Sequence, residues 1–192
     1  MIKEHIIENF RHPRGLYGRI AGRIMSTRDS NVRRNIWVAD VLAPAPDARI
    51  CEIGHGPGIA IEHLWTRLTT GHIVGVEISA LMSRTAARRN RAGVQAGIVE
   101  FRVADSAALP SDLDGFDLIF GVNASMFWND AQAAIDGLVE RLAPDGELVL
   151  VFMPPPTSDE SAASVAAAYA RHFTTAGLID VRHDEMDYIP PA

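Results

Sequence analysis

Three glycines at alternate positions, Gly54, Gly56 and Gly58, stand at the end of a short apolar segment, Ile50–Ile53. The segment carries a single acid, Glu52, and its other residues are typical of a buried strand. Glycine adopts positive φ and has no Cβ, so a strand that ends in this way can turn sharply and let a ligand approach its backbone. The pattern predicts a ligand-binding turn directly after a buried strand.

A helix is expected after the turn, over residues 59–68. Its apolar residues recur at helical spacing, at Ile61, Leu64, Trp65 and Leu68. The free N–H groups at the start of such a helix face the glycines. A dinucleotide-binding turn would need glycine at position 59, where this chain has Ile59. An NAD-dependent oxidoreductase is therefore ranked third, after the two interpretations given below.

With Glu52 two residues before Gly54, the segment resembles the first motif of the class I S-adenosylmethionine-dependent methyltransferases, hydrophobic-acid-hydrophobic-Gly-x-Gly-x-Gly. Four later segments resemble the family's next strands in the same order: His72–Glu77, Ile98–Ser106, Phe116–Asn123 and Leu142–Phe152. The resemblance implies a doubly wound, mainly parallel, Rossmann-like α/β sheet. It also implies S-adenosylmethionine as the cofactor and S-adenosylhomocysteine as the product.

The family's sheet runs 3-2-1-4-5-7-6, with an antiparallel strand 7. After the last apolar stretch, Leu178–Tyr188, only four residues remain, so strand 7 has no room. Either the sequence stops short of that strand, or strand 5 has an edge that is open or otherwise covered. Six parallel strands or a homodimer would be compatible with such an edge.

The resemblance further implies roles for the acids at the strand ends. Glu77 is expected to bind the ribose hydroxyls, and Asp105 the adenine amino group, with a helix N-cap as the competing explanation for Asp105. Glu52 is expected to position the methionine end of the cofactor, because a buried carboxylate without a partner is costly; the alternative is that backbone N–H groups merely hold it. The other expected cofactor contacts are Gly54, His55, Gly56, Gly58, Ile78, Ser106 and Asn123.

His55 occupies the variable position between the glycines, and we expect it to be exposed to the cofactor loop. One histidine without a placed carboxylate is weak support for a general base. If the acceptor is a phenol or an acidic carbon, the candidates for a base are His5, His12 and Tyr17, among which the sequence does not choose. No metal is expected.

The loop after the fourth strand, residues 123–130, is the expected acceptor-facing segment, because open α/β folds bind ligands at the carboxyl ends of their strands. Its expected substrate contacts are Ser125, Phe127 and Trp128. The other interpretation is that the two aromatic residues plug the core while Asp130 caps a helix at 131–142. The loop lacks the Asn/Asp-Pro-Pro-aromatic sequence of enzymes that methylate adenine, cytosine or glutamine nitrogens.

The first forty residues differ in charge from the rest, with eight Lys/Arg against four Asp/Glu, whereas the remainder has ten against twenty. We expect residues 1–43 to form a helical cover over a core of residues 44–192, within one structural domain. This basic segment is either a solvated face or a lid that steers an anionic acceptor, in which Tyr17 and Met25 would contact the acceptor. A helix starting near Asp29 or Ser30 is expected to turn five residues toward the sheet: Val32, Ile36, Trp37, Val41 and Leu42.

Composition limits the remaining classes. A chain of 192 residues with 47% hydrophobic residues suits one domain with a sizeable core. Its net charge of −6 disfavours a nucleic-acid partner. No apolar run approaches membrane-spanning length and the N-terminus lacks a signal-peptide pattern, so a soluble cytoplasmic protein without a membrane partner is expected. The only cysteine, Cys51, is expected to be buried, which excludes disulfides and Cys-based metal sites within one chain.

The resemblance implies a chemistry that needs little catalytic machinery. A sulfonium methyl group is already activated, so the protein mainly has to align an acceptor atom with it. We therefore expect methyl transfer by in-line displacement to oxygen, nitrogen or carbon of a small molecule. The main alternative is a catalytically silent domain that binds the cofactor or regulates another protein.

Overall fold

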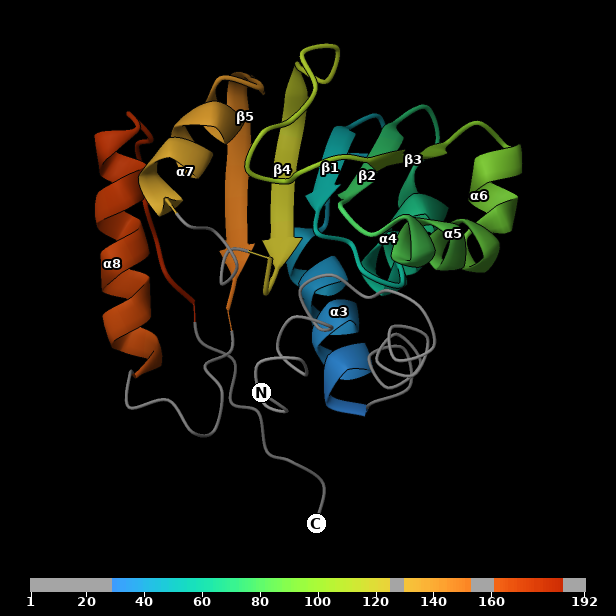
Figure 1. The fold of residues 1–192 in the computed structure, drawn as a ribbon, viewed down its shortest axis with the longest axis horizontal. Helices are drawn as coiled ribbons and strands as arrows, with labels where there is room; N and C mark the ends of the chain where they lie inside the picture. Colours follow the sequence, from blue (N-terminus) through green and yellow to red (C-terminus); the bar gives the residue numbers. More distant parts are fainter. Residues whose placement is uncertain (1–28, 125–129, 153–160, 185–192) are drawn as a thin grey trace.

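The computed structural model describes residues 29–124, 130–152 and 161–184 (Figure 1). These residues form five strands: β1 (Arg49–Ile53), β2 (His72–Glu77), β3 (Val99–Val103), β4 (Phe116–Val122) and β5 (Leu142–Val151). The helices are α3 (Asp29–Leu42), α4 (Ile59–Leu64), the 3-10 turn η1 (Trp65–Arg67), α5 (Ala80–Arg89), α6 (Arg91–Gln95), α7 (Ala131–Val139) and α8 (Ala162–Thr175). Strands and helices alternate along the chain, which is the pattern of a parallel sheet with crossover helices.

The strands form one sheet in the order β3-β2-β1-β4-β5, and every neighbouring pair is parallel. The expected Rossmann-like order is thus confirmed for the first five strands. The Pro-x-Gly segment at the start of β5 is a bulge: Phe116 pairs with Leu142, whereas Leu118 already pairs with Glu147.

Two hydrophobic clusters cover opposite faces of this sheet. One contains Ile50 of β1 together with buried residues of α3 and α4, and the other contains Cys51 and Ile53 together with buried residues of α7. Side chains of a strand alternate between the two faces, so Glu52 lies on the Ile50 face, beneath α4. The expected burial of Cys51 is confirmed.

Helix α3 packs on the sheet partly as expected, because Trp37 and Leu42 lie against the core cluster on the Ile50 face. Its buried residues in the second half are Val38 and Ala39, whereas Val41 is 53% exposed, so the expectation that Val41 faces the sheet is wrong. Asn35, Val38, Ala39 and Leu42 follow the i, i+3, i+4, i+7 spacing of one helical stripe, and Val41 lies outside that stripe. The rest of the expected cover, residues 1–28, lies outside the described residues.

Two other boundaries differ from the expected ones. The helix expected over residues 59–68 is α-helical only to Leu64 and continues as η1 to Arg67. In the Leu178–Tyr188 stretch, residues 178–184 form no strand, and the remainder lies outside the described residues. Within the described part of the chain, β5 therefore pairs with β4 alone. Dimerisation through this edge stays a prediction.

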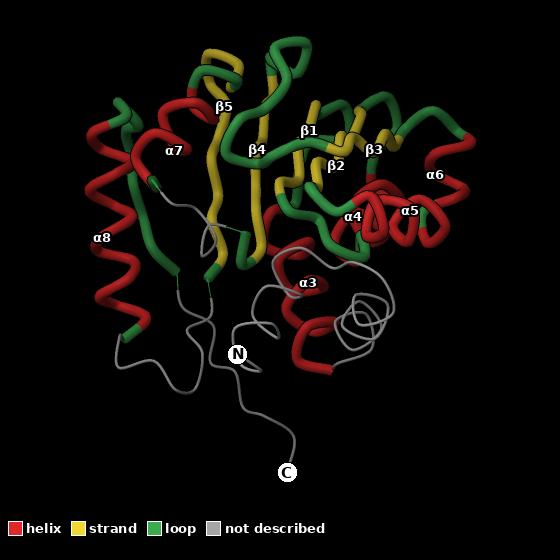
Figure 2. The backbone as a smooth tube through the Cα atoms, viewed as in Figure 1, coloured by secondary structure: helices red, strands yellow, loops and turns green. Residues whose placement is uncertain are grey.

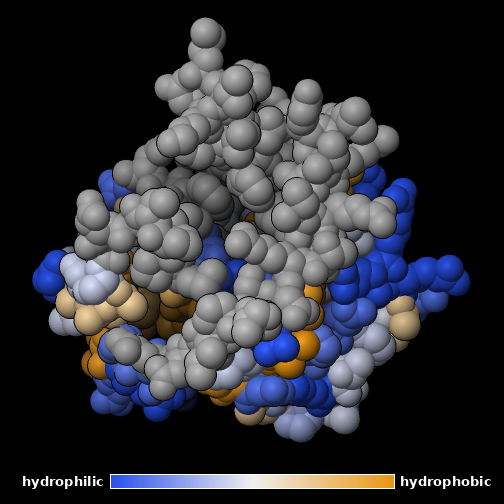
Figure 3. Space-filling model, turned by 90° about the horizontal axis from the view of Figure 1, so that it is seen from below, coloured by the Kyte–Doolittle hydropathy of each residue, from blue (hydrophilic) through white to orange (hydrophobic). Residues whose placement is uncertain are grey.

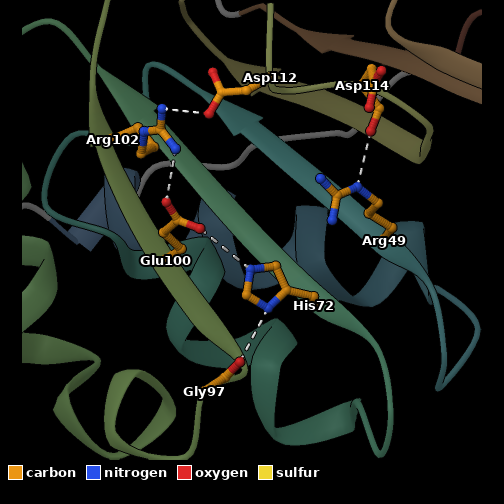
Figure 4. A network of polar contacts seen from close by, with 7 residues as sticks. All are labelled: Arg49, His72, Gly97, Glu100, Arg102, Asp112 and Asp114. Atoms are coloured by element: carbon orange, nitrogen blue, oxygen red, sulfur yellow. Dashed lines mark hydrogen bonds and ion pairs between the residues drawn. The ribbon is translucent and has the colours of Figure 1, made fainter. Parts of the chain in front are cut away.

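Polar contacts extend from the amino ends of β1 and β2 along β3 to the loop before β4 (Figure 4). Arg49 donates through Nε to the carbonyl of Asp114 at 2.9 Å, and His72 lies with Nε2 3.9 Å from a Glu100 carboxylate oxygen. Arg102 of β3 binds both Glu100 and Asp112, and its guanidinium holds the pKa of the Asp112 carboxyl below its usual value. Such charges on the edge strand β3 discourage further strand pairing. Arg49 and His72 begin their strands and so lie at the opposite ends from the glycine turn, whereas Arg102 pairs with Val76 near the carboxyl end of β2.

The carboxyl ends of the strands form the edge from which the glycine turn leads into α4, as the tube view also shows (Figure 2). Ligands of open parallel sheets bind at this edge. Figure 3 views the molecule from this side, where the described residues present both hydrophobic and hydrophilic surface. None of the helices in the described ranges is long and apolar enough to cross a membrane.

Candidate functional site

The glycine turn is strongly left-handed. Gly54, Gly56 and Gly58 have φ of 63°, 51° and 72°, a region that residues with a Cβ rarely adopt. The Gly54 N–H donates to the Val76 carbonyl at 2.8 Å, which joins the turn to the end of β2. A Cβ on Gly54 would lie 2.7 Å from the Cβ of Ala124, whereas one on Gly56 would meet nothing within 4 Å. The turn is thus packed at its first glycine and open at its second.

Glu77, the last residue of β2, holds the turn through its carboxylate. Oε2 accepts the Gly56 N–H at 3.1 Å, and Oε1 accepts the Ser79 N–H at 2.8 Å. The residue is only 8% exposed. Carboxylate oxygens have further lone pairs, so Glu77 can still accept hydrogen bonds from a ligand's hydroxyl groups.

Glu52 is a second buried carboxylate beneath the same turn. It is 1% exposed, and its Oε2 has no hydrogen-bond partner among the described residues. Burial raises the pKa of this carboxyl well above its ordinary value, the nearby charge of Glu77 raises it further, and a hydrogen bond from the backbone N–H of Ile61 opposes the shift. An unpartnered buried carboxyl oxygen is a costly feature that a cationic ligand group would relieve.

His55 is buried rather than exposed to the cofactor loop, so that expectation is wrong. It is 3% exposed, and its ring packs against Phe101 of β3 with ring centroids 4.8 Å apart. Burial lowers the pKa of its imidazole to about 4, which keeps the ring neutral. The space for the ring comes from Gly75, where a Cβ would lie 2.9 Å from His55 Cδ2. An enclosed imidazole with a pKa near 4 is a weak base that an acceptor would not reach.

Comparison with known proteins decides between the two enzyme classes considered for this site, a methyltransferase and an NAD-dependent dehydrogenase. The profile of the methyltransferase domain family matches residues 50–146, about half of the chain, from β1 to the bulge of β5. The chain belongs to this family. Together with the parallel sheet, this makes the protein a class I S-adenosylmethionine-dependent methyltransferase, and it displaces the dehydrogenase alternative.

Three relatives of this methyltransferase indicate how far the likeness extends. The methyltransferase YdaC of Bacillus subtilis is 27% identical over 164 residues, covering 84% of this chain and 87% of YdaC. An O-methyltransferase of Pyrenophora dematioidea is 27% identical over 116 residues, but the chain spans only 43% of its length. A methyltransferase structure from Aquifex aeolicus matches with TM-score 0.65 at 13% identity, covering 81% of this chain and 87% of that chain. At this identity the structural match supports the fold alone.

The site of the methyltransferase fits its family's cofactor. S-adenosylmethionine carries an ammonium group, two ribose hydroxyls and a sulfonium. The buried Oε2 of Glu52, which no described residue partners, is an acceptor suited to the ammonium group, and the Glu77 carboxylate is suited to two hydroxyl donors. The open side of Gly56 lets a ligand approach the backbone between them.

The other expected cofactor contacts of the methyltransferase lie around this centre. Ile78 follows Glu77 and is 39% exposed, and Asn123 follows β4 with φ of 57°. Asp105 is exposed, and its Oδ1 accepts the Ala107 N–H at 2.9 Å. It therefore caps a turn rather than a helix, and this contact leaves its second oxygen for an adenine amino group. Ser106 comes next in that turn and is half-buried.

The expected acceptor and base residues of the methyltransferase lie outside the described residues: His5, His12, Tyr17, Met25, Ser125, Phe127 and Trp128. Asp130 is described, and it caps α7 by accepting the Ala133 N–H at 3.0 Å, which confirms the expected cap. Within the described ranges, no group of three His, Cys, Asp or Glu side chains is placed to hold a metal ion.

Several residues that hold the turn of the methyltransferase were missed by sequence reasoning. Asn90, at the end of α5, donates through Nδ2 to the Gly58 carbonyl at 3.0 Å, and Ser83 lies against the His55 ring. Gly75 and Phe101 make the pocket for that ring. The one local signal was Gly75, because a glycine inside a strand often marks close approach of another group.

Proposed function

We propose that this methyltransferase transfers the methyl group of S-adenosylmethionine to an oxygen, nitrogen or carbon atom of a small molecule. The observation that carries the proposal is Glu52 Oε2, which has no partner among the described residues, near the charge of Glu77 and beneath a glycine turn that is open at Gly56. When bound, the cofactor supplies an activated sulfonium methyl group. The protein's own residues then have to bind, orient and dehydrate the reactants, which can supply roughly 7–11 kcal/mol of the barrier.

Each group in the site has a proposed task. Glu77 accepts from the ribose hydroxyls while its N–H donors, Gly56 and Ser79, keep its carboxylate in place. Glu52 holds the ammonium end, and Asp105 receives the adenine amino group. His55 takes no proton from the acceptor, because it is enclosed and its pKa is held near 4. A base, where the acceptor requires one, has to come from another residue or from the acceptor itself.

The acceptor class rests on two features. The net charge of −6 supports an acceptor other than a nucleic acid. The segment Asn123-Ala124-Ser125-Met126 lacks the Pro-Pro-aromatic motif of enzymes that methylate nucleobase or glutamine nitrogens. The O-methyltransferase among the relatives makes hydroxyl acceptors the first class to test.

The first experiment is calorimetric titration of the wild type, Glu77→Ala and the control Glu62→Ala with S-adenosylmethionine, S-adenosylhomocysteine and NAD. Glu62 lies on α4 and is ion-paired with Arg89 at 2.7 Å, so its loss leaves the glycine turn intact. We expect micromolar dissociation constants for the first two ligands with the wild type and the control, and binding weakened by about ten-fold or more in Glu77→Ala. Binding of NAD alone would contradict the proposal.

The second experiment follows a labelled methyl group from the cofactor into panels of phenols, carboxylic acids, amines, RNA and protein. Transfer to a small molecule supports the proposal, and the labelled product identifies the methylated atom. Transfer confined to RNA or protein contradicts the small-molecule acceptor. Cofactor binding with no transfer to any panel favours the catalytically silent domain.

A further inference from the structure

The imidazole of His55 extends from the glycine turn toward β2 and β3 of the sheet. It stands over Gly75 of β2, beside Phe101 of β3 and against Ser83 of α5, and it is almost completely buried. The ring thus connects three elements of the core with the cofactor turn. A residue in this place can fill space between the elements or hold the turn in position. The hydrogen bonds of the ring indicate which of these two roles His55 has.

The polar contacts of the ring require one tautomer. Nδ1 lies 2.9 Å from the Gly56 carbonyl oxygen, which can only accept, so Nδ1 carries the proton. Nε2 is then the acceptor, and it lies 3.5 Å from the Ser83 hydroxyl, which can donate. Both nitrogens of a neutral imidazole are used, and a buried neutral ring agrees with a pKa lowered to about 4.

Gly56 is thereby held on both sides. Its carbonyl accepts from His55 Nδ1, and its N–H donates to Glu77 Oε2 at 3.1 Å. Gly56 has a φ of 51°, and a Cβ there would meet nothing within 4 Å, so no side-chain packing fixes this position. Together with the Gly58 N–H, which donates to the His55 carbonyl at 2.9 Å, these two hydrogen bonds hold the peptide groups of the turn where the backbone is open to a ligand.

We infer that His55 is a positioning residue for S-adenosylmethionine, which holds the Gly56 peptide through Nδ1–H and so keeps Glu77 directed toward the ribose. The inference rests on the proposed function. The chain runs from Ser83, through His55 and Gly56, to Glu77, so a side chain of α5 supports the carboxylate at the end of β2. In the competing interpretation the ring only fills the space over Gly75.

Three variants separate these interpretations, with thermal stability and the dissociation constant for S-adenosylhomocysteine measured for each. His55→Phe keeps the ring volume but has no donor. His55→Asn loses ring volume, but its amide nitrogen stands near the Nδ1 position and can donate to the Gly56 carbonyl. His55→Gln carries its amide further out, near the Nε2 position, and serves as the amide control for His55→Asn.

We expect His55→Phe and His55→Asn to rank in one order by thermal stability and in the opposite order by affinity for S-adenosylhomocysteine. His55→Phe should be more stable than His55→Asn but bind about ten-fold more weakly than the wild type. His55→Asn should bind within about three-fold of the wild type, and His55→Gln about ten-fold more weakly. Affinity that follows thermal stability across the variants would overturn the inference. A wild type that binds neither S-adenosylmethionine nor S-adenosylhomocysteine would overturn the proposed function and this inference together.

A measurement on the wild type tests the hydrogen bond directly. Nitrogen-15 spectra of histidine-labelled protein at neutral pH report which ring nitrogen carries the proton. We expect a protonated Nδ1 and an unprotonated Nε2 for His55, with the His55→Asn spectrum used to assign the resonance. The opposite tautomer would overturn the inference, because Nδ1 could not then donate to Gly56.

Discussion

Gly75 of β2 provides the space that the imidazole ring of His55 occupies. A Cβ at this position would lie 2.9 Å from His55 Cδ2, 2.9 Å from Phe101 Cδ1 and 2.8 Å from Ile61 Cδ1. β2 is hydrogen-bonded to a strand on each side, so its backbone has little freedom to move away. The glycine turn after β1 therefore depends on a missing side chain in the neighbouring strand.

Gly75→Ala should destabilise the protein through this crowding. We expect a loss of roughly 1–3 kcal/mol in the free energy of unfolding, the usual cost of an extra methyl group in a packed core. The affinity for S-adenosylhomocysteine should fall as well, because the displaced ring is bonded to Gly56. Urea denaturation and calorimetric titration measure the two effects, and unchanged affinity in a destabilised variant would argue against this coupling.

Gly137→Ala is the matched control for the previous substitution. Gly137 lies inside α7, and a Cβ there would meet nothing within 4 Å. Alanine in a helix interior is favoured over glycine, so we expect a gain of roughly 0.5–1 kcal/mol in the free energy of unfolding. Cofactor affinity should not change. A loss of stability at both positions would mean that the crowding at Gly75 is not specific.

Glu52→Gln should increase stability while weakening cofactor binding. The folded state raises the pKa of the Glu52 carboxyl, so its contribution to stability is full below about pH 4.5, the ordinary value, and is lost as the pH rises through the folded-state value. Glutamine does not titrate, so the free energy of unfolding of the variant should exceed that of the wild type by a margin that grows with pH. Near pH 8 we expect this margin to be about 1–3 kcal/mol. Denaturation at several pH values measures this gain; a difference independent of pH would contradict it.

The low pKa of His55 predicts the opposite pH dependence. Its folded-state pKa of about 4 lies below the ordinary 6.5, so its contribution to stability is full above pH 6.5 and is lost as the pH falls toward 4. The loss amounts to roughly 3 kcal/mol. His55→Asn lacks this titration, and the difference between its unfolding curves and those of the wild type at about pH 7 and pH 4.5 isolates the effect from other groups. If the stability difference between the wild type and His55→Asn were the same at both pH values, the ring would not be held neutral.

Arg67 should anchor the end of α3. Its Nη1 donates to the Ala39 carbonyl at 2.6 Å, and its Nη2 pairs with Asp40. Arg67→Ala should cost about 1 kcal/mol and accelerate amide exchange in the last turn of α3, because a carbonyl loses its donor and the helix end loses a cation. Arg84→Ala, on the exposed side of α5, is the control and should leave exchange in α3 unchanged. Equal exchange in the two variants would show that packing alone holds the helix.

The strands, the glycine turn and the acids Glu52 and Glu77 could be predicted because each depends on residues close together in the chain. Alternating or continuous apolar residues predict strands, and glycines at alternate positions predict a turn with positive φ. Motif order then implied the sheet order, which the structure confirms for five strands. The cap at Asp130 was also predictable, because an N-cap contacts a backbone N–H only three residues away.

Packing between distant segments decided the rest. The sequence shows His55 only as a polar residue in a turn, whereas its burial requires Gly75, Ser83 and Phe101 to meet around it. Likewise, the exposure of Val41 depends on which stripe of α3 fits the sheet. Local patterns are readable because backbone geometry and hydrophobic period act over a few residues. The sequence by itself determined the elements and the glycine turn; only the tertiary structure decided which side chains hold that turn, because the space around a side chain is set by atoms far along the chain.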